Sequence, residues 1–252
     1  MKRIILAIVA VVALIACNFS IIPETGNGVP VETALDPGEF DALSIPSSID
    51  VVYKQTTGEQ SITFTCDENL KEYYNIRVEN NTLIAGMRPG ITNIRPRVKT
   101  VLTVNSPVLK EVRLSGSGDC VIESPVKADE NFLIKVTGSG DIQTKGLIEC
   151  KDFSSRTSGS GDIGVAGVVS ESAELKVTGS GNVGVDGLTA QTITASTSGS
   201  GDIILKCKDA GDIEASITGS GDIILTGNAR TLKSSDSGSG DIVTRDFSLQ
   251  GK

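Results

Sequence analysis

The sequence predicts an all-β protein: a parallel β-helix or solenoid of about seven coils, right-handed in its winding, with a β cap at the amino-terminal end. The first observation is that Ser/Thr-Gly-Ser-Gly-Asp/Asn recurs seven times between Leu114 and Thr244, at intervals of about 20 residues. A fixed period of this size is typical of repeats that bury their apolar face only by stacking on their neighbours. The second is composition, since 28 glycines, 4% aromatic residues and no Trp favour a narrow stacked core over a wide globular one.

The amino terminus resembles the leader of a bacterial lipoprotein. Lys2 and Arg3 precede an apolar run from Ile4 to Ala16, which has the length of a signal-peptide core and is too short to span a bilayer comfortably. The run ends in Leu14-Ile15-Ala16-Cys17, which resembles a lipobox. This resemblance implies that residues 1–16 are a signal peptide and that Cys17 is lipidated. The membrane is then a partner through the lipid anchor.

A flexible tether is predicted over residues 17–38. Pro23, Gly26, Gly28 and Pro30 interrupt this segment, and it shows no apolar periodicity. The folded part is therefore expected to begin near Phe40.

Residues 39–105 are predicted to form an amino-terminal β unit. Residues 49–53 and 61–65 alternate in polarity around Thr57-Gly58, and residues 76–78 and 82–84 flank Asn80-Asn81, so two β-hairpins are expected. Residues 68–74 are the one helical candidate. Because the open end of a solenoid invites other strands, we expect this unit to cap it.

The solenoid itself is assigned to residues 106–252. In each repeat, apolar residues recur at every second position before and after the Gly-Ser-Gly corner, which predicts two strands that point them inward. The corner glycines are expected to adopt positive φ and to let successive turns stack closely. The Asp or Asn at the end of the corner is expected to form an Asx-turn. The seven predicted members of this structural turn ladder are Asp119, Asp141, Asp162, Asn182, Asp202, Asp222 and Asp241. Asn182 keeps the hydrogen-bond acceptor but not the charge, which indicates that this position requires a geometry and not a charge.

Two chemical readings compete with that structural role. A calcium ladder would use the same carboxylates, but the calcium-binding β-roll has a nine-residue period and a second glycine-rich turn. A carbohydrate-cleaving enzyme would need two carboxylates in different environments, whereas these are uniform and the chain has no His. We therefore predict no enzyme activity, no metal and no cofactor.

A row of Ser and Thr beside the corner is either a hydrogen-bonded ladder or a polar groove for glycans.

A possible contact stripe lies on the outside of the last three coils. Ile204, Ile224 and Val243 occupy an outward position where the second, third and fourth coils have Gln143, Gly164 and Gly184. An apolar outer stripe suggests a contact surface for a protein ligand or a second copy. The alternative is that the tail residues Phe247 and Leu249 cover it.

Net charge bears on nucleic-acid binding, and the cysteines bear on possible disulfides. The formal net charge is -8 and the pattern shows no basic stripe, so nucleic acid is excluded as a partner. A disulfide between Cys66 and either Cys120 or Cys150 is left open. Cys207 is expected to be a free, buried thiol.

The chain after the tether resembles the auto-transporter adhesin, head GIN domain family of bacterial envelope proteins. The resemblance rests on Phe40-Asp41-Ala42-Leu43-Ser44-Ile45, on Asn81-Thr82-Leu83-Ile84, and on Pro107-Val108-Leu109-Lys110-Glu111-Val112 leading into the first corner. It implies an all-β head with a β-helical part on a secreted or lipid-anchored protein. The Gly-Ile-Asn tripeptide of the family's name is absent, and Gly-Asp-Ile stands in the repeats instead.

The function predicted from these features is a lipid-anchored, non-enzymatic adhesion or recognition head of a bacterial envelope, at the outer membrane. The alternative is a periplasmic structural or assembly scaffold without an external ligand. Surface or periplasmic display, the identity of a glycan or protein ligand, and homo-oligomer formation are left open by the sequence.

Overall fold

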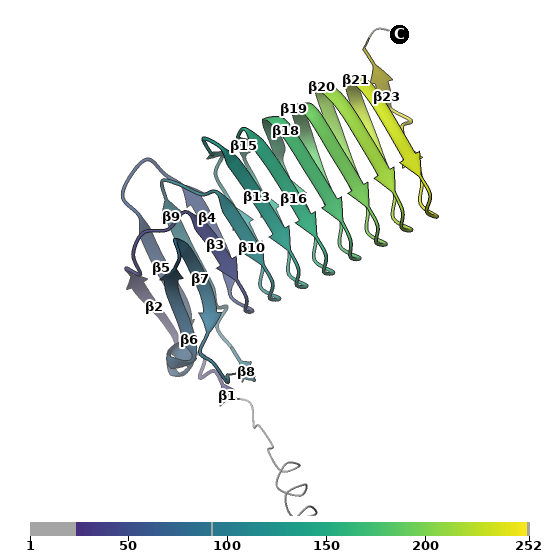
Figure 1. Cartoon of the computed structure of the whole chain (residues 1–252). Helices are drawn as coiled ribbons and strands as arrows, with labels where there is room; N and C mark the ends of the chain where they lie inside the picture. Colours follow the sequence, from purple (N-terminus) through teal and green to yellow (C-terminus); the bar gives the residue numbers. More distant parts are fainter. Residues whose placement is uncertain (1–23, 92, 251–252) are drawn as a thin grey trace, which may run out of the picture.

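The computed structural model describes residues 24–91 and 93–250 of the chain. The predicted signal peptide, Cys17 and the first part of the predicted tether lie outside these residues. Figure 1 shows an elongated stack of strands with a cap at one end and the carboxy terminus at the other. The all-β solenoid of about seven turns is therefore confirmed.

Each turn of the solenoid has two main faces that meet at the Gly-Ser-Gly corner. The pre-corner face contains β3 (Ala42–Ile45), β10 (Glu111–Leu114), β13 (Asn131–Val136), β16 (Asp152–Thr157) and the second half of β18 (Gly167–Val177). The post-corner face contains β4 (Asp50–Gln55), β11 (Cys120–Ile122), β14 (Ile142–Thr144) and β17 (Ile163–Val165). A short third wall starts with β12 (Val126–Lys127) and β15 (Leu147–Glu149). In later turns the long strands β19 (Val183–Thr197), β20 (Ile203–Ile217) and β21 (Ile223–Asp236) run through all three.

Neighbouring turns pair in parallel and keep equivalent residues opposite each other. Val112 pairs with Ile134, which pairs in turn with Ser155. The predicted inward positions are buried on both faces, from Val112 in the first repeat to Ile217 in the sixth. The last repeat differs, since Ser234 and Asp236 stand at the inward positions of the pre-corner strand and are exposed. This polar final turn ends the core.

The cap continues the same ladders before it closes them. β3 pairs in parallel with β10 on one side and with β7 (Thr82–Met87) on the other. β4 pairs likewise with β11 and with β9 (Val101–Ser106). Beyond these strands the pairing becomes antiparallel, with β6 (Tyr74–Glu79) beside β7 and β5 (Ser61–Asp67) beside β9. The prediction of a capping β unit is thus in agreement with the observed strand order.

One of the two predicted hairpins is wrong. β4 and β5 are consecutive along the chain, but β9 lies between them and pairs with both. A local turn signal at Thr57-Gly58 does not reveal a strand that returns from 46 residues further on. The other hairpin, β6–β7, is confirmed, with Asn80 and Asn81 at φ 51° and 59° as its tight turn requires. The helical candidate forms a short 3-10 helix, η1 (Glu68–Tyr73).

The predicted tether is wrong for its second half. β1 (Glu24–Thr25) pairs with β8 (Ile94–Arg95), and β2 (Pro30–Leu35) pairs antiparallel with β5. The fully buried carboxylate of Asp67 fastens the segment, because it accepts hydrogen bonds from the backbone N–H of Gly28 at 2.7 Å and of Arg97 and Val98 at 2.9 Å. Burial alone would raise the pKa of Asp67, but these three bonds and the nearby Arg97 hold it below its usual value.

The carboxy-terminal segment adds two short strands to the last long strand. β22 (Ile242–Val243) pairs with the start of β21, and β23 (Phe247–Leu249) pairs with Gly227–Ala229. The tail therefore runs along the third wall. The second half of β21 pairs with β20 alone among the described strands and carries exposed charges such as Arg230 and Lys233. Such charges discourage edge-to-edge pairing.

All four cysteines of the described part are free thiols. Cys66 therefore pairs with neither Cys120 nor Cys150, and the expectation of a free, buried Cys207 is confirmed. Burial raises the pKa of Cys120 to about 12 and that of Cys207 to about 11. Within the described residues, no helix combines the length and the apolar character needed to cross a bilayer.

Candidate functional site

The corner glycines allow one turn to lie directly on the next. A Cβ atom added at Gly159 would overlap the carbonyl oxygen of Gly138 in the preceding turn, and the same clash recurs at every corner. Ser160 donates its backbone N–H to that same carbonyl oxygen at 3.0 Å. The predicted positive φ is absent from these corners, because the described glycines with positive φ are Gly28, Gly38, Gly90 and Gly227. Close stacking alone explains glycine here.

The acidic position of the corner bonds between turns and not within its own turn. Each carboxylate or amide Oδ1 accepts a hydrogen bond from the backbone N–H of the equivalent residue in the next turn, at 2.7 to 3.0 Å. The acceptors in order are Asp50, Asp119, Asp141, Asp162, Asn182, Asp202 and Asp222, and Asp241 donates to the last of them. We call this series the aspartate ladder. It replaces the Asx-turn that the sequence suggested.

The aspartate ladder has two consequences for chemistry. Asp50 joins it from the cap, although its corner lacks the Gly-Ser-Gly sequence, so the ladder starts one turn before the repeats do. In every turn but the last, one oxygen of each side chain is already committed to a backbone amide. No group of three or more His, Cys, Asp or Glu side chains among the described residues could hold a metal ion. The ladder's visible role is to lock the spacing of the turns.

The possible contact stripe is brought together by register. Ile204 pairs with Ile224 and Ile224 with Val243, so the three side chains lie side by side on the outer post-corner face. Ile204 is 40% exposed, whereas Ile224 and Val243 are half-buried. The tail strand β23 lies beside Gly227–Ala229 and not along these residues. Part of the stripe therefore remains open to solvent.

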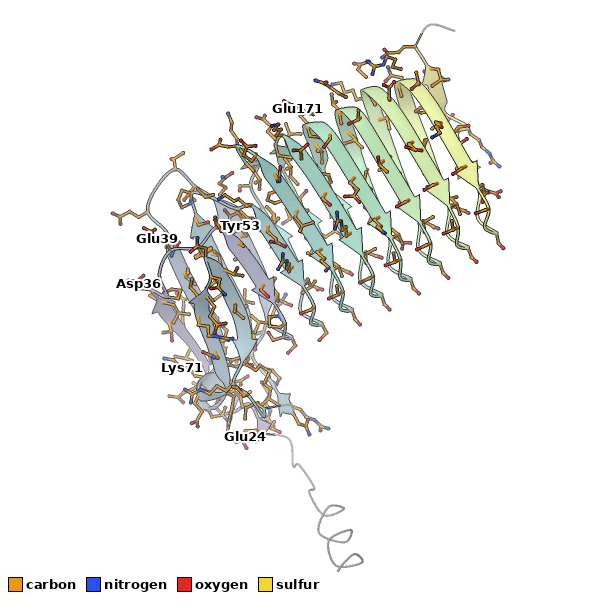
Figure 2. All side chains as sticks on the ribbon, in the orientation of Figure 1. Glu24, Asp36, Glu39, Tyr53, Lys71 and Glu171 are labelled. Carbon is orange, nitrogen blue, oxygen red and sulfur yellow. The ribbon has the colours of Figure 1, made fainter. Side chains whose placement is uncertain are left out.

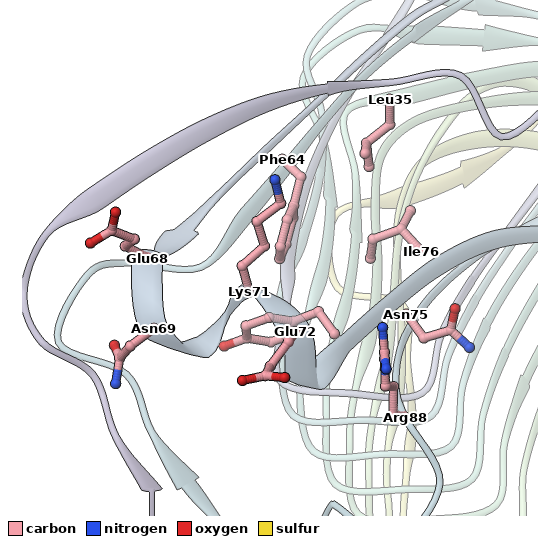
Figure 3. Close-up of a pocket in the computed structure, with 10 residues that line it drawn as sticks. Leu35, Phe64, Glu68, Asn69, Lys71, Glu72, Asn75, Ile76 and Arg88 are labelled. Atoms are coloured by element: carbon pink, nitrogen blue, oxygen red, sulfur yellow. The ribbon is translucent and has the colours of Figure 1, made fainter.

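The cap contains a hollow of about 530 Å³ beside η1. Figure 3 shows Leu35, Phe64 and Ile76 on one side of it, with Lys71 reaching towards Phe64. Glu68, Glu72 and Arg88 also line it, so its border carries charges of both signs (Figure 3). This mixture does not select a ligand by charge. The hollow lies within the cap, between the end of β2 and the start of β6.

A row of basic residues on the outer pre-corner face is the feature that the sequence analysis missed. Three positions before the first glycine, four successive repeats carry a cation, and parallel register aligns them. This basic row consists of Arg113, Lys135, Arg156 and Lys176. The next three repeats have Ser196, Ser216 and Ser235 at the same position. The expectation that the pattern has no basic stripe is therefore wrong.

The basic row is exposed and only partly neutralised. Arg113 pairs with Glu111, and Arg156 Nη2 lies 2.6 Å from Glu174 Oε2. Lys135 and Lys176 make no ion pair with any described residue. Neighbouring turns are about 4.8 Å apart. Like charges at that spacing repel by roughly 0.9 kcal/mol per pair even at the dielectric constant of water. A mobile anion would relieve this repulsion.

A hollow of about 260 Å³ lies within the basic row beside the corner. Its lining consists of Lys135, Arg156, Thr157, Ser158, Lys176 and Thr178. Ser158 and Thr178 are exposed, and Thr178 Oγ1 donates a 3.3 Å bond to the carbonyl of Thr157. In Figure 2 the oxygen-tipped side chains of the corners repeat along one edge of the stack, opposite the bend that carries Glu171. Cations and hydroxyls thus meet at one edge, and we take this as the candidate binding site.

Comparison with solved structures shows that several proteins share the fold of this chain. A putative adhesin from Bacteroides fragilis is 24% identical with a TM-score of 0.78, covering 87% of this chain and 98% of that one. A putative lipid binding protein from Parabacteroides distasonis is 25% identical with a TM-score of 0.73, covering 90% and 97%. A putative adhesin from the same species is 23% identical with a TM-score of 0.74, covering 87% and 98%. No curated protein matches the chain.

The family described as "putative auto-transporter adhesin, head GIN domain" matches residues 39–228 and again residues 172–250. Together these matches span the cap strands from β3 onward, every corner of the solenoid and the basic row. The resemblance inferred from the sequence is thereby confirmed. The chain belongs to this head GIN domain family.

Proposed function

We propose that the protein is a lipid-anchored, non-enzymatic adhesion or recognition head of a bacterial outer membrane. The observation that carries this proposal is the aspartate ladder, which holds the outer side chains of successive turns at one fixed spacing. A surface of this kind presents the same groups repeatedly to a repetitive partner. The family match and the neighbours named as putative adhesins support an adhesin-like role.

A binding role suits the acidic residues better than catalysis does. Glycoside cleavage needs one carboxyl group to act as an acid and another as a nucleophile or base, in unlike environments. The ladder carboxylates share one environment, and each one before the last turn accepts a backbone amide hydrogen bond. This uniformity supports a non-enzymatic function.

The lipid anchor would keep the cap of the head close to the membrane. Only residues 18–23 separate Cys17 from β1, which begins at Glu24. Even a fully extended chain would span about 24 Å between these points. A lipid at Cys17 would therefore hold the cap near the membrane.

Replacement of Cys17 by Ser tests the anchor. The account predicts that the wild-type chain sediments with the membrane fraction and that the Cys17→Ser chain is released as a soluble protein. A Cys120→Ser chain is a matched control, because it removes a thiol buried in the core and leaves the lipobox intact. Membrane retention of the Cys17→Ser chain would contradict lipid anchoring.

The periplasmic scaffold remains the second candidate, because Ile204 of the possible contact stripe is uncovered. Labelling intact cells with a membrane-impermeant amine reagent separates the two, since Lys206 and Lys233 are exposed. Labelling at the level of a known surface protein supports the recognition head. Labelling only after the outer membrane is opened, as for a periplasmic control, would favour the scaffold; Ile224→Asp should then abolish association with its partner.

A further inference from the structure

We propose that the basic row binds an acidic polysaccharide, a chain whose carboxylate or sulfate groups recur along its length. This inference rests on the proposed recognition function and deepens it by naming the ligand class. The site comprises Arg113, Lys135, Arg156 and Lys176 with the corner hydroxyls beside them. It lies on the outer pre-corner face of the first four repeats.

The geometry of the row suits a linear polyanion. The four cations stand on adjacent strands in register, so they form one line about 14 Å long with one charge every 4.8 Å or so. Two glutamates accompany the four cations, so the site keeps a positive excess. The chain as a whole carries a formal charge of -8, which makes this local excess an exception on its surface. Successive anionic groups of one chain could each meet a cation.

The hydroxyls beside the row add groups that a sugar can use. Ser158 and Thr178 line the same hollow as Lys135, Arg156 and Lys176. The hydroxyl of Ser158 can accept or donate a hydrogen bond, whereas that of Thr178, which already donates to the carbonyl of Thr157, can accept one from a sugar hydroxyl. A carboxylate would sit against the cations while the ring hydroxyls face the corner.

The surroundings favour a polysaccharide over a single-stranded nucleic acid. Nucleic-acid sites of that kind rely on aromatic side chains on which bases stack. The aromatic residues of the strands that carry the row, Phe132 and Phe153, point into the core and are buried.

The chain itself supplies a conservative way to remove the site. Serine already occupies the position in the fifth, sixth and seventh repeats, as Ser196, Ser216 and Ser235. The triple variant Lys135→Ser, Arg156→Ser, Lys176→Ser therefore extends a native row of serines. A control triple, Lys145→Ser, Lys206→Ser, Lys233→Ser, changes the net charge equally but leaves the basic row intact. Circular dichroism and thermal melting would verify that both triples fold.

Binding is measured with the full-length chain purified in a neutral detergent. The probes are polygalacturonate, dextran sulfate, neutral dextran and single-stranded poly-dT, each titrated by calorimetry at low and physiological salt. We expect wild type and the control triple to bind polygalacturonate or dextran sulfate, with affinity falling as salt rises. The row triple should bind at least about tenfold more weakly, because three of its four cationic contacts are gone.

Several results would overturn the inference. Equal binding by the row triple and the control triple would show that general charge is responsible. Equal affinity for neutral dextran, tighter binding of poly-dT, or no binding of either acidic polymer would each reject an acidic polysaccharide as the ligand. Failure of these titrations in a protein that is labelled on intact cells leaves the recognition head standing, so the two proposals fail separately.

Discussion

At the scale of single residues, the acidic corner position stabilises the stack through its acceptor oxygen. The side chain of Asp202 accepts the backbone N–H of Asp222 at 2.8 Å, and Asn182 does the same for Asp202. The amide of Asn182 also donates to Asp162 at 3.1 Å. The position therefore needs an oxygen at the right distance, and a charge is not required.

Asp202 provides a direct test of that requirement. Asp202→Asn should change the free energy of unfolding by less than about 0.5 kcal/mol, because it keeps the acceptor. Asp202→Ala should cost about 1 to 2 kcal/mol, because the N–H of Asp222 loses its partner. Urea unfolding followed by circular dichroism measures both. Equal losses in the two variants would mean that the charge, and not the acceptor, is what the position needs.

Asp67 should make the cap sensitive to acid. Its pKa in the folded protein is lower than in the unfolded chain, so it stabilises the fold above the unfolded value near 3.9 and this contribution is lost as the pH falls through the folded value. Asp67→Asn removes the titrating group. Melting temperatures between pH 6 and pH 2 should fall more steeply for wild type than for the variant; parallel curves would show that Asp67 contributes nothing to acid sensitivity.

The basic row shows why some residues of a candidate site are missed when only the sequence is read. The corner residues recur in all seven repeats and are therefore recognised from the sequence. The cations occur in only four repeats, and serine occupies the position in the other three. They lie about 20 residues apart along the chain, so no local cluster of charge reveals them. Reading each aligned position down the repeats, polar positions included, would have found the row.

At the scale of single elements, each corner is shaped by how close the turns approach. The backbone of Gly159 lies so near the carbonyl oxygen of Gly138 that no side chain fits. Gly184 is the second residue of β19, and an added Cβ there would meet nothing within 4 Å. Two glycines of one solenoid therefore have opposite tolerance to substitution.

These two glycines form a matched pair of variants. Gly159→Ala should destabilise the protein by about 3 kcal/mol, because backbone atoms of two turns must separate. Gly184→Ala should be neutral or stabilise it by up to about 1 kcal/mol, because alanine restricts the unfolded chain and its φ is not positive. Chemical unfolding compares them. Similar stability of both variants would contradict close stacking as the reason for the corner glycines.

The corner row as an element is predicted to be independent of calcium. One oxygen of each ladder residue before the last turn already accepts an amide hydrogen bond. Millimolar calcium or a chelator should therefore leave the melting temperature unchanged, as scanning calorimetry would show. A rise in melting temperature with calcium would restore the calcium-ladder interpretation.

The elements that sequence analysis predicted poorly all depend on distant partners. β2 is a single alternating strand among glycines and prolines. It pairs with β5, and the adjacent Gly28 bonds to Asp67, so its partners lie 27 to 39 residues further along the chain. β9 inserts between β4 and β5, which local turn signals had paired with each other. The β6–β7 hairpin needs only its own two-residue turn, and it was predicted correctly.

At the scale of the whole molecule, the fold is a one-dimensional stack with different ends. The solenoid could be predicted from the fixed period of the sequence, because each repeat contacts its neighbours in the same way. The cap closes one end with antiparallel strands, and the polar last turn closes the other. The basic row lies in the half of the stack nearest the cap. The outer surface therefore also differs between the two halves, with cations in the first four repeats and serines in the last three.

The proposal that this head attaches cells to an acidic polymer through the basic row can be tested on whole cells. Cells that carry the wild-type protein, the row triple, the control triple or no protein would be washed over a surface coated with polygalacturonate, and the retained cells counted. The account predicts equal retention with wild type and the control triple, and retention with the row triple no higher than without the protein. Equal retention with the row triple and wild type would contradict it.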